Sequence, residues 1–157
     1  MKKIMFSFVL AMAAIQFSYA QDLNSLINEL AKTEGAQHQV IDRSMLNMAN
    51  DQGETDKSAL MQNLDSIVVL AIEGCKPEIK DKFLAVFENF KDGNGYETLL
   101  NVKDGQDKVL IVSHKEGDVS TDVYILALDE KDIAIVKMSG KLSDSDLADI
   151  IDKQKNK

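Results

Sequence analysis

The stretch FKDGNGYETLLNVKDGQDKVLIVSH, residues 90–114, contains the point at which the spacing of apolar residues changes. Before Asp92, apolar residues recur every three or four positions, which is the period of an α-helix. After Gly95 they recur with a period of two, which is the period of a β-strand. The DGNG segment between them is predicted to be a turn, because Gly and Asn readily adopt the positive φ angles that turns require.

The DGNG segment could also open a calcium-binding loop of the EF-hand type. Such a loop needs an oxygen ligand at position 5, glycine at position 6 and a bidentate glutamate at position 12. Counted from Asp92, these positions hold Tyr96, Glu97 and Lys103. We therefore predict that the segment is a turn and that it binds no metal.

Four segments after the turn have the pattern of strands. Short polar links that contain Gly or Asp separate them, and such links join antiparallel neighbours. The predicted strands are residues 96–102, 108–114, 120–128 and 132–138. In the fourth strand, Ile133 and Ile135 alternate with Ala134 and Val136, so both faces carry apolar residues. Because helices are expected on one face, the other face is either covered by the rest of the chain or binds a partner.

The segments on either side complete the predicted fold. Apolar spacing predicts helices at residues 23–31, 43–50 and 77–90, a helical turn near residues 60–64, a short strand at 40–41 and a buried central strand at 67–72. Ser143 is the predicted N-cap of a last helix, with Asp146 three residues further on. We predict an α+β fold in which an antiparallel meander of about four C-terminal strands, with one or two N-terminal strands, packs against three to four helices.

Residues 1–20 have the pattern of a secretory signal peptide. Two lysines precede an apolar run over residues 4–17, and small residues lead up to Ala20. The run is too short to cross the roughly 30 Å of a bilayer core. We predict cleavage between Ala20 and Gln21, export to the periplasm or the exterior, and no stable membrane anchor in the mature chain.

The mature chain, residues 21–157, has the size of one domain. We predict a single α+β domain whose last residues, 153–157, form a frayed tail. The full chain has a net charge of −8, and removal of Lys2 and Lys3 with the signal peptide makes it −10, since residues 1–20 contain no acid. Such negative charge argues against nucleic acid and anionic membrane surfaces as partners.

Cys75 is the only cysteine, so an intramolecular disulfide is excluded. It precedes a predicted helix N-terminus and adjoins Lys76, and both features lower the pKa of a thiol. A reactive thiol also needs a base, and only His38 and His114 are available, neither of them near Cys75 in sequence. Cys75 is therefore interpreted as a small residue at a strand end, with a reactive thiol or an intermolecular disulfide as alternatives.

The remaining polar residues form no recognisable catalytic or metal-binding motif. His38 and His114 have no partner at a metal-ligand spacing, and His114 is predicted to lie on the exposed surface at the end of a strand. Acidic pairs such as Asp144 with Asp146 are typical of helix N-termini and solvated faces. We predict no catalytic residues, no metal and no cofactor.

Two segments resemble a known family. YETLLNVKDGQDKVLIV at residues 96–112 and IVKMSGKLSDSDLADI at residues 135–150 resemble the hairpin and the closing segment of domain-of-unknown-function family 4252. The resemblance implies an exported bacterial protein, mainly of the Bacteroidota, and supplies no catalytic residue. Many family members carry a lipoprotein cysteine after the signal peptide, and this chain has none at that place.

These observations lead to one expected function and two alternatives. We expect an exported, non-catalytic accessory or binding module of the cell envelope, with a protein partner or a second copy bound through an apolar sheet face. The first alternative is a thiol-dependent or redox-responsive protein that uses Cys75. The second is a carrier of a small ligand bound between the sheet and the helices.

Overall fold

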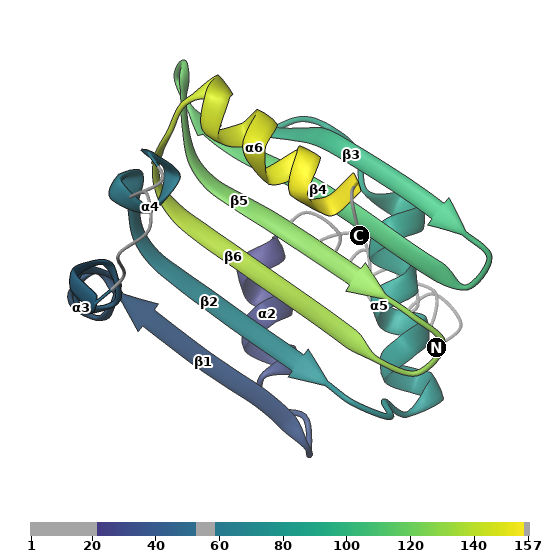
Figure 1. The fold of residues 1–157 in the computed structure, drawn as a ribbon. Helices are drawn as coiled ribbons and strands as arrows, with labels where there is room; N and C mark the ends of the chain where they lie inside the picture. The colour runs from purple at the N-terminus through teal and green to yellow at the C-terminus, as the bar shows by residue number, and fades with distance from the viewer. Residues whose placement is uncertain (1–21, 53–58, 156–157) are drawn as a thin grey trace, which may run out of the picture.

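The computed structural model describes residues 22–52 and 59–155 and contains one six-stranded antiparallel sheet (Figure 1). The strand order is β1-β2-β6-β5-β4-β3. The strands are β1 (Ala36–Asp42), β2 (Leu64–Ile72), β3 (Tyr96–Asp104), β4 (Asp107–Glu116), β5 (Val119–Leu128) and β6 (Ile133–Leu142). The last four strands form the predicted meander, and β2 and then β1 extend it beyond β6, which confirms the α+β class.

Helices lie on both faces of the sheet (Figure 1). They are α2 (Leu23–Leu30), α3 (Arg43–Gln52), α4 (Ala59–Asn63), α5 (Pro77–Asn89) and α6 (Asp144–Lys155). Helices α2 and α5 cover one face, whereas α6 crosses the other face and α3 and α4 lie where β1 ends and β2 begins. The described residues contain five helices, one more than the three to four predicted, because α4 forms at the helical turn expected near residues 60–64. Helix α6 also continues through Lys155, past the predicted start of a frayed tail at residue 153.

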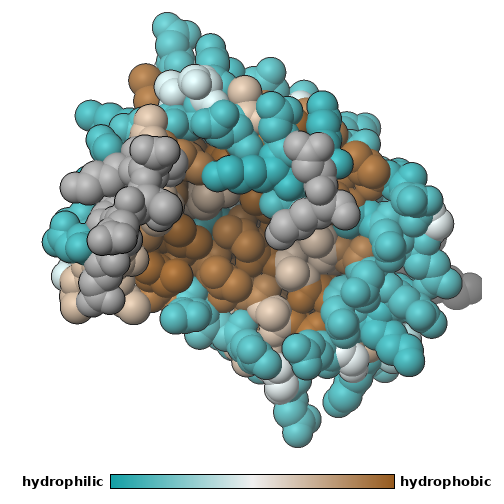
Figure 2. Space-filling model, viewed as in Figure 1, coloured by the Kyte–Doolittle hydropathy of each residue, from teal (hydrophilic) through white to brown (hydrophobic). Residues whose placement is uncertain are grey.

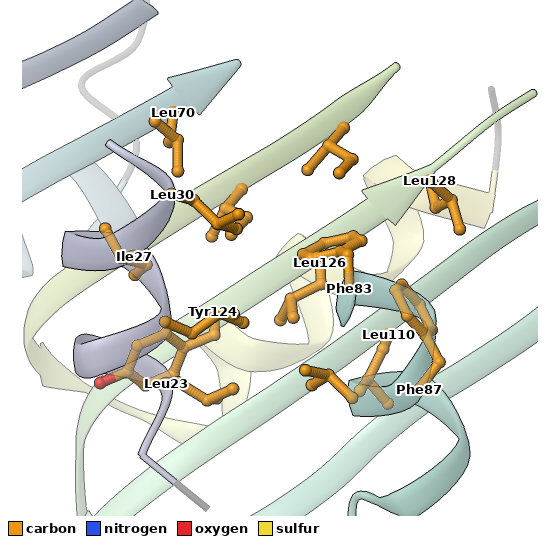
Figure 3. Close-up of a cluster of buried hydrophobic side chains, with 14 of the residues drawn as sticks. Leu23, Ile27, Leu30, Leu70, Phe83, Phe87, Leu110, Tyr124, Leu126 and Leu128 are labelled. Carbon is orange, nitrogen blue, oxygen red and sulfur yellow. The ribbon is translucent and has the colours of Figure 1, made fainter. Parts of the chain in front are cut away.

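The larger core lies between the sheet and the pair α2 and α5 (Figure 3). Helix α2 buries Leu23, Ile27 and Leu30 on the sheet, as its apolar spacing predicts. Helix α5 contributes Phe83 and Phe87, whose rings meet edge to face with centroids 5.3 Å apart. Burial of each such ring contributes roughly 1.5–3 kcal/mol. This core holds α2 and α5 firmly against one face.

A second core covers part of the opposite face. Leu147 and Ile150 of α6 pack over Ile111 and Val123, and Leu46 of α3 belongs to the same buried cluster. The start of α6 is a capping box, as predicted. The Asp146 backbone N–H donates to Ser143 Oγ at 3.2 Å, and the Ser143 backbone N–H donates to Asp146 Oδ2 at 2.9 Å.

The DGNG segment is a turn, as predicted. Gly93 and Tyr96 exchange two backbone hydrogen bonds of 3.0 Å, and Gly93, Asn94 and Gly95 have φ angles of 143°, 53° and 86°. The Asp92 carboxylate accepts a hydrogen bond of 2.9 Å from the backbone N–H of Thr98, and this bond stabilises the turn.

The prediction of a buried central strand at residues 67–72 is correct for only one face. Strand β2 is second from the edge of the sheet, and Leu70 and Ile72 are buried under α2 and α5. On the other face, Val69 and Ala71 are partly exposed. A run of apolar residues does not tell whether both sides of a strand are covered.

Candidate functional site

Part of the sheet face that carries α6 is apolar and only partly covered by the described residues. Directly opposite residues of antiparallel strands point to the same face, so the register identifies its members. One row contains Val69 and Val136, and the next contains Ala71, Ala134, Ala127, Val109 and Val102. Ala134 and Val102 are exposed and the other five are partly buried, and we call these seven residues the open strip. Figure 2 shows the corresponding apolar surface in the middle of this face, with polar side chains around it.

The cover on this face decreases from β4 to β6 along one row. Ile111 of β4 is completely buried, and Ile125 of β5, directly opposite, is 8% exposed. Val136 of β6 and Val69 of β2 continue the row and are only partly buried. The second core therefore covers Ile111 and Ile125 of this row almost completely and covers Val136 only in part.

One end of the open strip is bordered by acidic turns. The β3–β4 and β5–β6 turns flank the row that contains Val109 and Ala134. Residues 103–108 and 129–132, which include these turns, together carry five acids and three lysines. An apolar surface with an acidic border favours a partner segment with apolar side chains and basic flanks.

A second feature, on the other face of the sheet, is a polar cluster beside the N-terminus of α2. Tyr96, His114, Asp122 and Ser139 lie directly opposite one another on four adjacent strands. In the next row, Tyr124 is opposite Lys137. The sequence analysis missed this cluster, because residues far apart in sequence meet only through the strand register. The one available signal was the spacing of Asp122 and the core residue Leu126. They are four positions apart in β5, so their side chains lie on the same face of the sheet.

The hydrogen bonds of the polar cluster fix α2 to the sheet. Tyr124 Oη donates to Asn24 Oδ1 at 3.2 Å, and Lys137 Nζ donates to the same oxygen at 2.8 Å. Asn24 lies in the first turn of α2. Ser139 Oγ donates to Asp122 Oδ1 at 2.6 Å. The cluster therefore satisfies its own polar groups while it anchors a helix.

This geometry does not form a serine nucleophile. A serine triad requires the histidine to accept the serine proton and the carboxylate to orient the histidine. Here the Ser139 hydroxyl donates directly to Asp122, and His114 Nδ1 lies 4.0 Å from Asp122 Oδ2, which is too long for a hydrogen bond. Burial raises the pKa of both Tyr96 and Tyr124, so neither phenol is a base near neutral pH.

The prediction that His114 lies on the exposed surface is wrong. His114 lies within β4 and is partly buried, with its ring centroid 4.6 Å from that of Tyr96. A Cβ atom at Gly95 would lie 2.8 Å from the Lys115 carbonyl oxygen and 3.0 Å from His114 Nε2. The DGNG turn therefore needs glycine at Gly95 both for its φ angle and for the close approach of β4.

Cys75 lies between β2 and α5 and is partly buried. Its backbone N–H donates to the Lys131 carbonyl at 2.8 Å, which joins this loop to the β5–β6 turn. Burial raises the pKa of the Cys75 thiol, although Lys80 acts in the opposite direction. A raised pKa is the reverse of what a nucleophilic thiol needs at neutral pH.

Within residues 22–52 and 59–155, no three His, Cys, Asp or Glu side chains gather as metal ligands, and no helix is long and apolar enough to span a bilayer. His38 lies exposed on β1. The space between α2 and the sheet, lined by Leu23 and Tyr124 among others, leaves no room for a water molecule, so a small ligand has no cavity there. Ala20 and Gln21, the predicted cleavage site, lie outside the described residues.

The fold defines a class of protein: an α+β domain whose antiparallel sheet carries helices on both faces and leaves part of one face open. A comparison with protein families matches residues 29–150 to the family described as Domain of unknown function (DUF4252). The chain belongs to this family, which confirms the resemblance noted in the sequence. Comparisons with curated proteins and with solved structures found no match.

Proposed function

We propose that the protein is an exported, non-catalytic accessory module of the cell envelope that binds a partner protein through the open strip. The observation that carries the proposal is the exposure of the strip in the centre of the sheet. Polypeptide chains usually cover such surfaces, and contiguous apolar patches mark interaction sites. The strip continues directly from the buried second core, so a partner would extend an existing apolar layer.

The chemistry of the strip defines the partner. Its members are valines and alanines, which offer a flat apolar surface without hydrogen-bonding groups. The acidic border and the net charge of −8 favour a protein segment in which apolar side chains are flanked by Lys or Arg. The proposed role is therefore recognition of an apolar, basic-flanked protein segment. Location in the envelope is supported by the signal-peptide pattern of residues 1–20.

Site-specific photo-crosslinking in the native cell envelope tests this proposal. A photoreactive amino acid replaces Ala134, an exposed residue in the strip, and in a second strain it replaces Val119, which is 45% exposed outside the strip. We expect a crosslinked product of defined mass from position 134 and none from position 119. The crosslinked partner segment should be apolar with basic flanks.

A second substitution checks that the product depends on the strip. With the photoreactive group at position 134, Val136→Asp should abolish the crosslink, because a charge would then lie in the apolar surface. Absence of a product at position 134, or equal products at positions 134 and 119, would contradict the proposal. A product that survives Val136→Asp would do the same.

A further inference from the structure

The two edges of the sheet differ in how they are protected against pairing with another chain. No described helix or strand lies along the outer side of β1 (Figure 1). Residues 36–41 of β1 contain no Asp, Glu, Lys or Arg, and no proline. The four residues from Gln37 to Val40 are exposed, and the Val40 side chain is an apolar group at 52% exposure. Strand β1 pairs with β2 in an unbroken register over all seven residues, so the edge is regular.

The opposite edge, β3, carries the features that normally prevent edge pairing. Its register with β4 shifts between Thr98 and Leu100, which marks a bulge. It also carries the charged residues Glu97, Lys103 and Asp104. Charges and bulges on edge strands are the usual protection against edge-to-edge association. The protein therefore protects β3 and leaves β1 available.

We propose that β1 pairs with β1 of a second copy of this chain in antiparallel orientation, so that two six-stranded sheets form one continuous sheet. The inference goes beyond the proposed function and does not depend on it. Exposed backbone N–H and C=O groups of an edge strand are a template for such pairing.

Self-complementarity points to a second copy as the occupant. A twofold axis perpendicular to the sheet keeps each face on its own side, so only residues of the same face meet. With the axis at Gln39, Gln39 meets its own copy and His38 meets Val40. With the axis at His38, Gln37 meets Gln39. In both registers no like charges meet within residues 36–41, and glutamine amides can pair with themselves because each both donates and accepts.

The net charge of the protein also favours β1 as the place where two copies make contact. Two copies of a chain with a net charge of −8 repel each other, so contact requires an uncharged surface. The dimer would place both open strips on the same side of the joined sheet, because the twofold axis preserves the faces. Gln39 already lies in the row of Val69 and Val136, so the two strips would be separated only by the paired β1 strands.

Light scattering after size exclusion tests the inference on the mature chain, residues 21–157. We expect a dimer for the wild type. The double variant Gln37→Glu/Gln39→Glu should raise the dimer dissociation constant at least about tenfold, because it places like charges opposite each other in either register. The matched control, Asn101→Glu/Gln106→Glu, adds the same two charges at the β3 side and should remain dimeric. Circular dichroism establishes that each variant is folded.

Disulfide trapping tests the register without weakening the dimer. In a Cys75→Ser background, either Gln39→Cys or His38→Cys should give a spontaneous covalent dimer, since Cα atoms across an antiparallel pair are roughly 4.5–5.5 Å apart and suit a disulfide. A wild type that stays monomeric up to about 0.1 mM, where even weak dimers form, would overturn the inference. A dimer that is not trapped by either cysteine variant would also overturn the inference. So would a dimer that dissociates in the Asn101→Glu/Gln106→Glu control but not in the Gln37→Glu/Gln39→Glu variant.

Discussion

Val136 of β6 lies directly opposite Ile125 of β5, yet Ile125 is 8% exposed whereas Val136 is only partly buried. Two neighbouring apolar residues on one face of one sheet thus have different surroundings. Ile125 belongs to the buried cluster that contains Leu147 and Ile150 of α6, whereas Val136 packs against this cluster only in part, and the open strip begins there. This boundary separates the part of the sheet that stabilises the fold from the part that is available to a partner.

We predict that the same substitution lowers the free energy of unfolding by different amounts on the two sides of this boundary. Ile125→Asp should lower the free energy of unfolding by at least about 4 kcal/mol, because it buries an unpaired carboxylate. Val136→Asp should lower the free energy of unfolding by only about 1–2 kcal/mol, because water reaches that position. Urea unfolding followed by circular dichroism measures both values. Equal costs would show that the two residues are equally covered.

The capping box of α6 should contribute measurably to stability. Asp146 is 2% exposed and accepts hydrogen bonds from Ser143 and, at 3.0 Å, from Asn63 Nδ2. Asp146→Ala should therefore lower the free energy of unfolding by about 1–3 kcal/mol at pH 7. Asp149→Ala, an exposed change in the same helix, should have little effect. Similar losses from the two variants would refute the role of the cap.

The same carboxyl predicts a pH dependence. Burial raises the pKa of Asp146, but hydrogen bonds from Ser143 and Asn63 outweigh it and leave that pKa below its ordinary value. A lowered folded-state pKa stabilises the protein above the unfolded value of about 4, and the contribution is lost as the pH falls through the folded value. Acid unfolding of wild type and Asp146→Ala should therefore converge below about pH 4. A constant difference down to pH 2 would contradict this.

Tyrosine ionisation should report the packing of the polar cluster. After cleavage at the predicted site, Tyr96 and Tyr124 are the only tyrosines, and the chain has no tryptophan. Burial raises the pKa of both phenols. Absorbance at 295 nm should therefore show incomplete ionisation at the ordinary phenol pKa of about 10. The stability that these groups provide is present below about pH 10 and is lost as the pH rises above it. Ordinary titration of both groups in the folded protein would disprove the packing.

Thiol titration distinguishes the Cys75 alternative from a binding module. Because burial raises the pKa of Cys75, its reaction with a thiol reagent should be slow at pH 7 and should accelerate only above the ordinary thiol value of about 8.5. Urea-unfolded protein is the control and should react at the ordinary rate. Rapid reaction of the folded protein at pH 7 would favour a thiol-dependent function.

Much of the fold follows from local patterns. The four C-terminal strands follow from the two-residue period, α5 from its Phe spacing, and α6 from Ser143 and Asp146. These features lie within short segments, where spacing and capping chemistry are visible in the sequence.

The candidate site could not be derived in the same way. The sequence shows that both faces of β6 are apolar, but it does not show that the second core covers Val136 only in part. That limit depends on the direction in which α6 leaves β6. The pairing of His114 with Asp122, and of Asp122 with Ser139, depends on register shifts next to both pairs. Such register shifts are determined by packing across strands, and no local pattern in this sequence predicts them.

The exposure of the open strip is measured most directly by NMR of the purified protein, residues 21–157, with a soluble nitroxide. The methyl signals of Val69, Ala134 and Val136 should be strongly attenuated, whereas those of Ile111 and Val123 should be preserved. Pairing through β1 would leave this result unchanged, since both strips remain on the surface. Equal protection of all five residues would mean that the chain covers its own sheet, and the proposed binding surface would not exist.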